Sequence, residues 1–195
     1  DKGLRPQSSL YLDRVTGHEL THVYQMGLRR GVARWLAPIF GEAIAPAALA
    51  PDWLLEGQAI WTESAGGGGR LYSAYQSMQM RTQLAQKGWY WPITQLSSAG
   101  RVNPPLNRAY TGGAFLYASL TGEYRASQHI AEWMDRQAAW PGLTGWNFSR
   151  SYNGRTLGEQ WTALEVAERI RLRENLRALN QAGYAVGMPL LEAPR

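Results

Sequence analysis

Cysteine is absent from this chain of 195 residues. The protein therefore can form no disulfide and can carry out no thiol redox chemistry, and a zinc site would have to use histidine and carboxylate ligands. A chain of this length is nevertheless long enough to bury a hydrophobic core without covalent cross-links. The composition thus predicts one domain, with or without a tail, that is held together by packing.

Long apolar runs are absent as well. No segment approaches the roughly 18 apolar residues that cross a membrane, so we expect no membrane span. The chain begins with Asp1 rather than methionine, and its first residues are not those of a signal peptide. We therefore expect the sequence to be a mature or excised piece of a longer product. Alternating strand patterns are few, and there is no heptad or internal repeat, which predicts a mainly helical domain.

Lysine is scarce, since Lys2 and Lys87 are the only two, and the net charge of +5 comes mostly from arginine. A basic chain raises the question of nucleic-acid binding. The densest basic run, residues 169–177, alternates with apolar residues and has acidic residues nearby. That pattern is more typical of the solvated face of a helix than of a phosphate-binding track, so we do not expect nucleic acid to be a partner.

Hydrophobic spacing and capping residues predict helices over about residues 10–30, 53–63, 71–86, 108–123, 126–138 and 156–182. The last of them opens with a capping box, Thr156 to Glu159, and Asn107 is a candidate cap for the fourth. We expect a connector with a short helical piece over residues 35–50 and an irregular aromatic stretch after residue 142. The predicted domain covers residues 1–182, and residues 183–195 are predicted to be a tail or linker.

In the first predicted helix, five residues share one stripe. The stripe indicates that the histidine-bearing face is also the buried face, and its members are Tyr11, Val15, His18, His22 and Met26.

Two of the three histidines in the chain form an HExxH motif, made by His18, Glu19 and His22. Residues four apart lie on one face of a helix, one turn above each other, so both imidazoles can reach a single metal ion. Glu19 would then face the open coordination position of that ion. The motif therefore predicts the metal site of a zinc hydrolase. The alternative is a pair of histidines that merely pack in the fold.

A catalytic zinc ion commonly has three protein ligands and an open position for water. Because cysteine is absent, the third ligand must be His129, an aspartate or a glutamate. Glu42 follows His22 by 20 residues and Glu56 follows it by 34, and both are candidates. The spacing of Glu42 is similar to that of thermolysin-like enzymes. Nothing in the sequence places His129 near His18, so we expect it to pack rather than to bind metal.

Residues 53–59, Trp-Leu-Leu-Glu-Gly-Gln-Ala, resemble the WLxEGxA element of the gluzincin, or peptidase MA-like, superfamily. The resemblance implies that Glu56 rather than Glu42 is the third zinc ligand, and that its helix packs against the HExxH helix. It also implies a zincin-like helical domain. The β-sheet that usually precedes the HExxH helix must be reduced or missing from this chain, because few residues precede the motif.

The resemblance is strongest to MA-like peptidase domains of exported bacterial proteins, which are often joined to a TolB-like β-propeller. It covers about residues 9–174 and includes Glu63 followed by a glycine-rich loop and Arg70, the segment 110–115, and the helix that carries Trp161. It implies an exported, periplasmic or secreted protein, with a β-propeller or another domain covalently linked outside this chain.

Two further residues receive roles. Tyr110 resembles the residue that donates a hydrogen bond to the oxyanion in related gluzincins, a task that suits a phenol because it stays protonated at neutral pH. The alternative for Tyr110 is a half-buried packing residue. Glu63 lies two helical turns beyond Glu56, so its carboxylate could orient a histidine ligand by accepting a hydrogen bond.

Together these features predict a zinc metallopeptidase with one Zn²⁺ ion and a peptide or protein substrate. His18, His22 and Glu56 would hold the ion, Glu19 would act as general base, and Tyr110 would stabilise the oxyanion. One alternative is a degenerate module, with or without metal, that serves as an interaction or scaffold domain of the bacterial envelope. A basic nucleic-acid-binding domain is the third interpretation.

Overall fold

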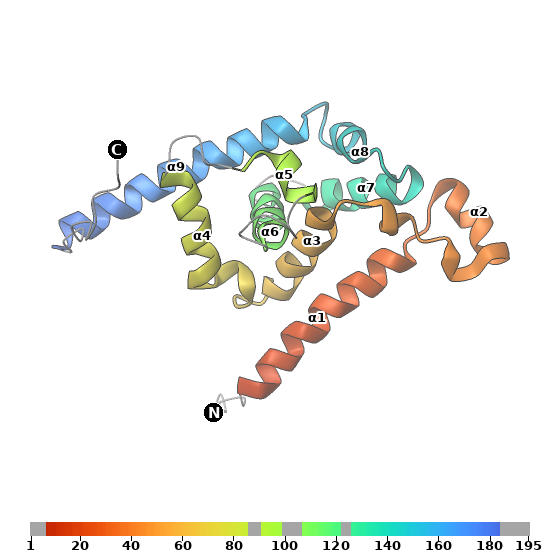
Figure 1. The fold of residues 1–195 in the computed structure, drawn as a ribbon, viewed down its shortest axis with the longest axis horizontal. Coiled ribbons are helices and arrows are strands. Elements are labelled where there is room, and N and C mark those ends of the chain that lie inside the picture. Colours follow the sequence, from red (N-terminus) through yellow and green to blue (C-terminus); the bar gives the residue numbers. More distant parts are fainter. Residues whose placement is uncertain (1–6, 86–90, 99–106, 122–125, 184–195) are drawn as a thin grey trace.

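The computed structural model describes residues 7–85, 91–98, 107–121 and 126–183. The described residues are mainly helical and contain no strand, which confirms the predicted mainly α class. Figure 1 shows the helices, which follow one another along the chain as α1 (Gln7–Gly27), α2 (Gly31–Phe40), α3 (Asp52–Ser64), α4 (Ala74–Ala85), α5 (Ile93–Ser98), α6 (Arg108–Leu120), α7 (Ala126–Ala139), α8 (Thr144–Ser151) and α9 (Leu157–Gln181). Short 3-10 helices lie at η1 (Gly41–Ala43), η2 (Pro46–Leu49) and η3 (Arg70–Tyr72).

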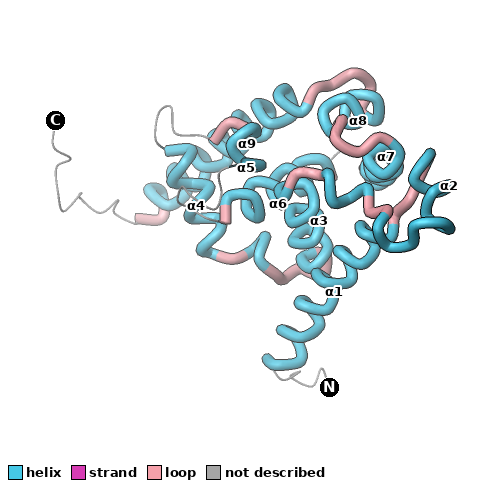
Figure 2. Tube along the Cα trace, turned by 45° about the vertical axis from the view of Figure 1, so that its right-hand side comes forward, coloured by secondary structure: helices cyan, strands magenta, loops and turns pink. Residues whose placement is uncertain are grey.

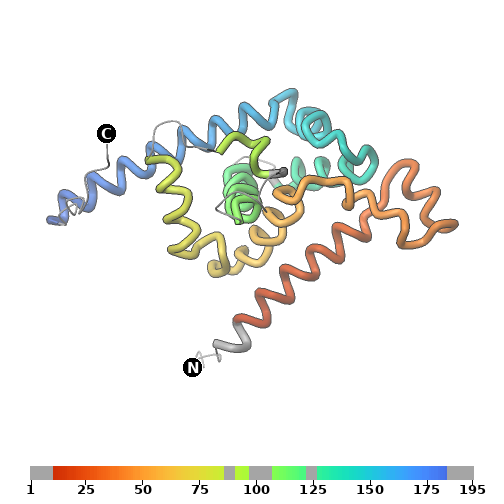
Figure 3. Tube along the Cα trace, in the orientation of Figure 1, coloured from red at the N-terminus to blue at the C-terminus, as the bar shows by residue number. Residues whose placement is uncertain are grey.

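Helices α3 and α6 pack against each other at the centre of the molecule, and α1 packs along α3 (Figure 3). Two glycines permit this close approach. A Cβ atom on Gly57 of α3 would lie 2.6 Å from the Cα of Gly113 in α6, and a Cβ on Gly113 would overlap the carbonyl oxygen of Trp53. Glycine lowers helix propensity, so its use here is explained by the backbone contact. The contact fixes the relative position of Glu56, next to Gly57, and of Tyr110, one helical turn before Gly113.

The hydrophobic core surrounds this helix pair and is rich in aromatic side chains. The Trp133 ring in α7 stacks on Tyr117 of α6 and meets Phe148 of α8 edge to face. All three side chains are almost fully buried, and a buried aromatic side chain is a large apolar contribution to stability. The core therefore joins α6, α7 and α8 into one packed unit with α3.

The predicted burial of the α1 stripe was wrong for three of its five residues. Tyr11 is 67% exposed, and Val15 and Met26 are each 37% exposed. His18 is buried as predicted and His22 is half-buried, but the other residues that α1 buries are Thr21 and Gln25. The reason is that α1 packs chiefly on α3 and η2, so that only a narrow strip of the helix is covered.

The capping box at the start of α9 is present as predicted. The Thr156 hydroxyl accepts a hydrogen bond from the Glu159 backbone N–H, and the Glu159 carboxylate accepts one from the Thr156 backbone N–H. Asn107 also precedes α6 as expected, but its side chain makes no cap. It exchanges two hydrogen bonds with Gln79 of α4 instead, both 3.1 Å long.

Helices α5 and α8 were not predicted, and α2 begins earlier than the short helical piece that was expected within residues 35–50. α5 follows the buried Trp91, and α8 occupies part of the stretch that was expected to be irregular. α8 is held by burial of Phe148 and by a hydrogen bond from the Asn147 side chain to Gln137 of α7. Such helices depend on tertiary packing, which a short window of sequence does not reveal.

None of the helices in the described part of the chain combines the length and the apolar character needed to cross a membrane. The predicted boundary between residues 1–182 and the tail 183–195 stays a prediction, because residues 184–195 lie outside the described residues.

Replacing Gly57 by alanine should lower the free energy of unfolding by about 1–3 kcal/mol, because the new methyl group meets the backbone of Gly113 rather than a flexible side chain. Thermal unfolding followed by circular dichroism measures the effect. Gly145→Ala in α8 is the matched control, since nothing lies within 4 Å of a Cβ added there. Equal melting temperatures for the two variants would contradict the proposed backbone contact.

Candidate metal centre

The HExxH histidines of α1 and Glu56 of α3 converge on one point. The Nε2 atoms of His18 and His22 lie 3.1 Å apart, and Glu56 Oε2 lies 3.4 Å from each of them. His18 is buried, and the other two side chains are half-buried. The three ligand atoms therefore form a nearly regular triangle between two packed helices.

The triangle is small enough for one metal ion to contact all three atoms. Four ligands at 2.0–2.1 Å in a tetrahedron lie about 3.3–3.4 Å from one another, close to the separations found here. Glu56 Oε2 is also buried without a hydrogen-bond partner, which is costly for a carboxylate oxygen unless a cation is nearby. The group formed by His18, His22 and Glu56 can therefore hold a metal ion, and its donor set suits zinc.

The second ring nitrogen of His18, Nδ1, contacts two charged side chains. Its Nδ1 lies 3.2 Å from Glu63 Oε2 and 2.7 Å from Nη2 of Arg70. When Nε2 binds a metal ion the proton resides on Nδ1, which can then donate to Glu63 but cannot accept from a guanidinium. The contact with Arg70 belongs to the opposite tautomer, so metal binding selects Glu63 as the partner of His18.

Electrostatics keep His18 in the form that binds metal. Burial, followed by the charges of Arg70 and His22, lowers the pKa of the His18 imidazole, although Glu56 and Glu63 act in the opposite direction. The ring is therefore neutral at neutral pH, as a metal ligand must be.

Glu63 is held in turn by Arg70 at the far side of a glycine-rich turn. Arg70 donates from Nε to Oε1 over 2.9 Å, from Nη2 to Oε2 over 2.8 Å, and from its backbone N–H to Oε1 over 3.1 Å. Gly67 and Gly69 both have a φ of 80°, which lets the chain turn back after α3 and return Arg70 to Glu63. Burial works to raise the pKa of the Glu63 carboxyl, but the hydrogen bonds and charge of Arg70 lower it below its ordinary value. Glu63 thus stays ionised beside His18.

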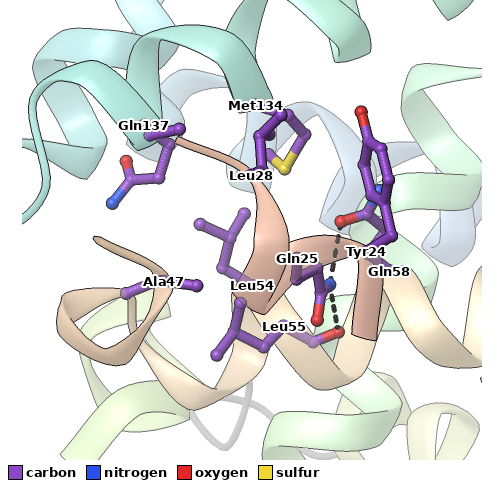
Figure 4. A pocket seen from close by; sticks show the side chains of 11 residues that line it. Tyr24, Gln25, Leu28, Ala47, Leu54, Leu55, Gln58, Met134 and Gln137 are labelled. Atoms are coloured by element: carbon purple, nitrogen blue, oxygen red, sulfur yellow. Dashed lines mark hydrogen bonds between the residues drawn. The ribbon is translucent and has the colours of Figure 1, made fainter. Parts of the chain in front are cut away.

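His22 is oriented by Gln25, one helical turn further along α1. The Oε1 atom of Gln25 lies 2.9 Å from His22 Nδ1 and accepts a hydrogen bond from the Nδ1–H group. The Nε2 group of Gln25 donates to the Leu55 carbonyl at 3.1 Å and to Gln58 Oε1 at 2.9 Å, as Figure 4 shows. Gln25 is 4% exposed. One buried amide therefore fixes the His22 ring and also joins α1 to α3 next to Glu56.

An open cleft of about 610 Å³ lies beside the metal-binding group. This volume is within the range of small-molecule and peptide-side-chain pockets. Glu19 lies exposed on the wall, next to His18. The cleft is lined by Tyr11, Arg14, Val15, His18, Glu19, Glu63, Gly69, Arg70, Ser73 and Tyr110.

Tyr110 reaches this cleft from α6. Burial, followed by the negative charge of Glu56 and a hydrogen bond with its carboxylate, raises the pKa of the Tyr110 phenol above its ordinary value. The phenol is therefore a permanent donor at neutral pH. Arg70 lies 5.7 Å from the centre of the Tyr110 ring, so the same arginine contacts Glu63, His18 and Tyr110.

The other candidate ligands lie elsewhere. Glu42 pairs with Arg29 at 2.9 Å. Its side chain is 92% exposed, so it lacks the burial of His18. The ring of His129 in α7 packs on Tyr152 with ring centres 5.1 Å apart. Neither residue belongs to the group that can hold a metal ion.

Two residues of the site received no role from the sequence. Gln25 lies three residues after His22, a spacing that places it on the same helical face, so the signal was present. Arg70 is separated from Glu63 by a glycine loop whose path no local pattern specifies. Its contact with His18, 52 positions away, comes only from the fold.

No match to this chain is found among protein-family models, curated proteins or solved structures.

Glu63→Ala should weaken zinc binding by about 10–100-fold, because it removes the acceptor for His18 Nδ1 and frees Arg70 to favour the wrong tautomer. Competition with a chromophoric chelator measures the zinc affinity. Glu174→Ala, an exposed position in α9, is the control and should leave affinity unchanged. A zinc affinity equal to that of the wild type in Glu63→Ala would show that Glu63 does not position His18.

Proposed function

We propose that this chain is a zinc metallopeptidase of the gluzincin type, with a zincin-like helical domain. The observation that carries the proposal is the triangle of His18, His22 and Glu56, together with an exposed carboxylate, Glu19, in the cleft that His18 also lines. A purely structural zinc site is closed by protein ligands and has no use for a free carboxylate at an open position.

When bound, zinc supplies a water of lowered pKa and an electrophilic contact for the scissile carbonyl. Glu19 is the candidate general base, which would accept a proton from the attacking water and pass it to the leaving nitrogen. Glu63 and Gln25 can accept hydrogen bonds from Nδ1 of His18 and His22, which would leave both Nε2 atoms free for the ion. The chain thus provides a candidate base and a set of ligands beside an open cleft.

Tyr110 is the candidate hydrogen-bond donor for the oxyanion. In this structure its phenol interacts with the carboxylate of Glu56, and when a substrate enters it donates to the oxygen that becomes negative during attack. A donor that stays protonated at neutral pH can stabilise this charge without a proton transfer. The position of Tyr110 on the cleft wall supports this role.

The resemblance of the HExxH and WLxEGxA elements to exported bacterial MA-like domains supports a peptide or protein substrate, an extracytoplasmic location and a linked β-propeller or other domain. Nucleic acid is a poorer candidate. In the basic run of α9, Arg169 pairs with Glu165 at 2.8 Å and Arg171 pairs with Glu168 at 2.7 Å, so acidic neighbours offset part of the charge.

Glu19→Gln should abolish turnover and leave zinc binding unchanged, because Glu19 is the base and not a ligand. Glu56→Ala should lose both activity and zinc affinity, because it removes one of three ligands. Zinc content by elemental analysis and chelator-sensitive cleavage of a mixed peptide library check both variants. A metal-loaded wild-type protein that cleaves no peptide would favour the degenerate scaffold module, and full activity in Glu19→Gln would exclude Glu19 as the base.

Tyr110→Phe should lower kcat by about 10²–10³-fold while zinc content and KM change little, since the phenol acts on charge that develops during the reaction. The measurement is steady-state kinetics on a peptide identified from the library. Tyr72→Phe, an exposed tyrosine in η3, is the control. A kcat that equals the wild-type value in Tyr110→Phe would assign Tyr110 a packing role.

A further inference from the structure

Arg14 lines the cleft beside the metal-binding group and has no part in the chemistry described above. It lies four residues before His18 on α1, which is one helical turn, or about 6 Å along the helix axis. On the helical wheel, Arg14 and Glu19 lie on opposite sides of the strip that carries the two metal-binding histidines. A substrate that passes over this strip from the side of Glu19 therefore meets Arg14 on the other side.

The guanidinium of Arg14 lies against the glycine-rich turn that follows α3. A Cβ atom on Gly68 would overlap Nη2 of Arg14 and would lie 3.0 Å from its Cζ, so the guanidinium occupies the space that a side chain at position 68 would need. Gly67 and Gly69 have a positive φ but Gly68 does not, so the sign of φ does not explain a glycine at this position. The place that Gly68 leaves for Arg14 does explain it.

The donors of Arg14 are available to a ligand. The N-terminal half of α1 projects from the other helices, as Figure 2 shows, and Arg14 belongs to this half and is exposed. Among the described residues, no carboxylate pairs with Arg14. The other arginine of the cleft, Arg70, is instead bound to both carboxylate oxygens of Glu63. The two arginines therefore differ in what they can offer to a substrate.

The charges around the metal-binding group leave Arg14 uncompensated. Glu63 offsets the charge of Arg70 through the hydrogen bonds between them. With a divalent ion bound, the carboxylates of Glu56 and Glu19 offset its two charges. Of the described residues that line the cleft or belong to the metal-binding group, Arg14 then carries the remaining charge. A positive charge on the wall of a cleft favours a substrate with an anionic group at that place.

We propose that Arg14 is a specificity-determining residue that binds a carboxylate of the peptide substrate, within two residues of the scissile bond. The proposal rests on the peptidase function proposed above. A guanidinium presents its N–H groups as a planar fork that matches a carboxylate. Because an extended peptide advances about 3.3–3.6 Å per residue, two residues span the helical turn that separates Arg14 from His18. The carboxylate belongs either to an acidic side chain or to a free C-terminus.

The test measures the affinity of the zinc-loaded protein for short peptide hydroxamates, which bind the metal and need no turnover. Probes with the hydroxamate at either end of the peptide cover both sides of the scissile bond. Each series compares glutamate with glutamine within two residues of the hydroxamate. In the series with an open C-terminus, the glutamine probe is made both free and amidated. The wild type should bind one of the carboxylate probes about tenfold more tightly than the neutral probe, and that probe identifies the source of the carboxylate.

Four variants assign the preference to Arg14. Arg14→Ala should abolish the preference and leave the affinity for the neutral probe unchanged, and Arg14→Glu should favour a probe with lysine in place of glutamate. Gly68→Ala should weaken the preference, because the new methyl group displaces the guanidinium. Gly66→Ala in the same turn is the matched control, since nothing lies within 4 Å of a Cβ added there. Zinc content should be unchanged in all four variants.

The outcomes separate this proposal from the peptidase function. Equal affinity of the wild type for all probes, or a preference that survives in Arg14→Ala, would overturn the role of Arg14 and leave the peptidase function in place. A preference that depends on Arg14, in a protein that cleaves no peptide, would support the carboxylate site and contradict the peptidase function. A zinc-loaded protein that binds no hydroxamate would overturn both.

Discussion

The position of Glu56 beside the two histidines depends on the backbone contact between α3 and α6. Gly57 and Gly113 remove the side chains that would separate the two helices, and the same contact carries Tyr110 toward the carboxylate of Glu56. Helix α1 is then attached to this pair by Gln25, whose amide donates to the Leu55 carbonyl. The site is therefore built on rigid helices rather than on loops, which favours fixed ligand geometry.

Hydrogen bonds from neighbouring side chains complete the site. Each histidine has an oxygen acceptor at its Nδ1, from Glu63 for His18 and from Gln25 for His22. The guanidinium of Arg70 offsets the charge of Glu63, so that an ionised carboxylate can remain next to a neutral imidazole. The same guanidinium lies over the ring of Tyr110. These contacts leave Nε2 of both rings facing Glu56, which is the arrangement that a single metal ion needs.

The sequence predicted those parts of the structure whose signals are local. The HExxH spacing placed His18 and His22 on one face, and the Thr156 capping box marked the start of α9. The burial of α1 was not predictable in detail, because a narrow contact with α3 buries Thr21 and Gln25 and leaves Tyr11 and Met26 exposed. Arg70 was missed as a partner of His18 because a glycine turn sets its position. Helices α5 and α8 were missed because short helices depend on tertiary contacts.

Zinc-edge X-ray absorption on the zinc-loaded protein tests the central claim most directly, because it measures the atoms bound to the ion. The geometry of His18, His22 and Glu56 predicts one zinc ion per chain, with two imidazole nitrogens and one carboxylate oxygen at about 2.0–2.2 Å and a water as the remaining ligand. A zinc ion bound without imidazole, or a protein that retains no zinc after purification and titration, would contradict the account.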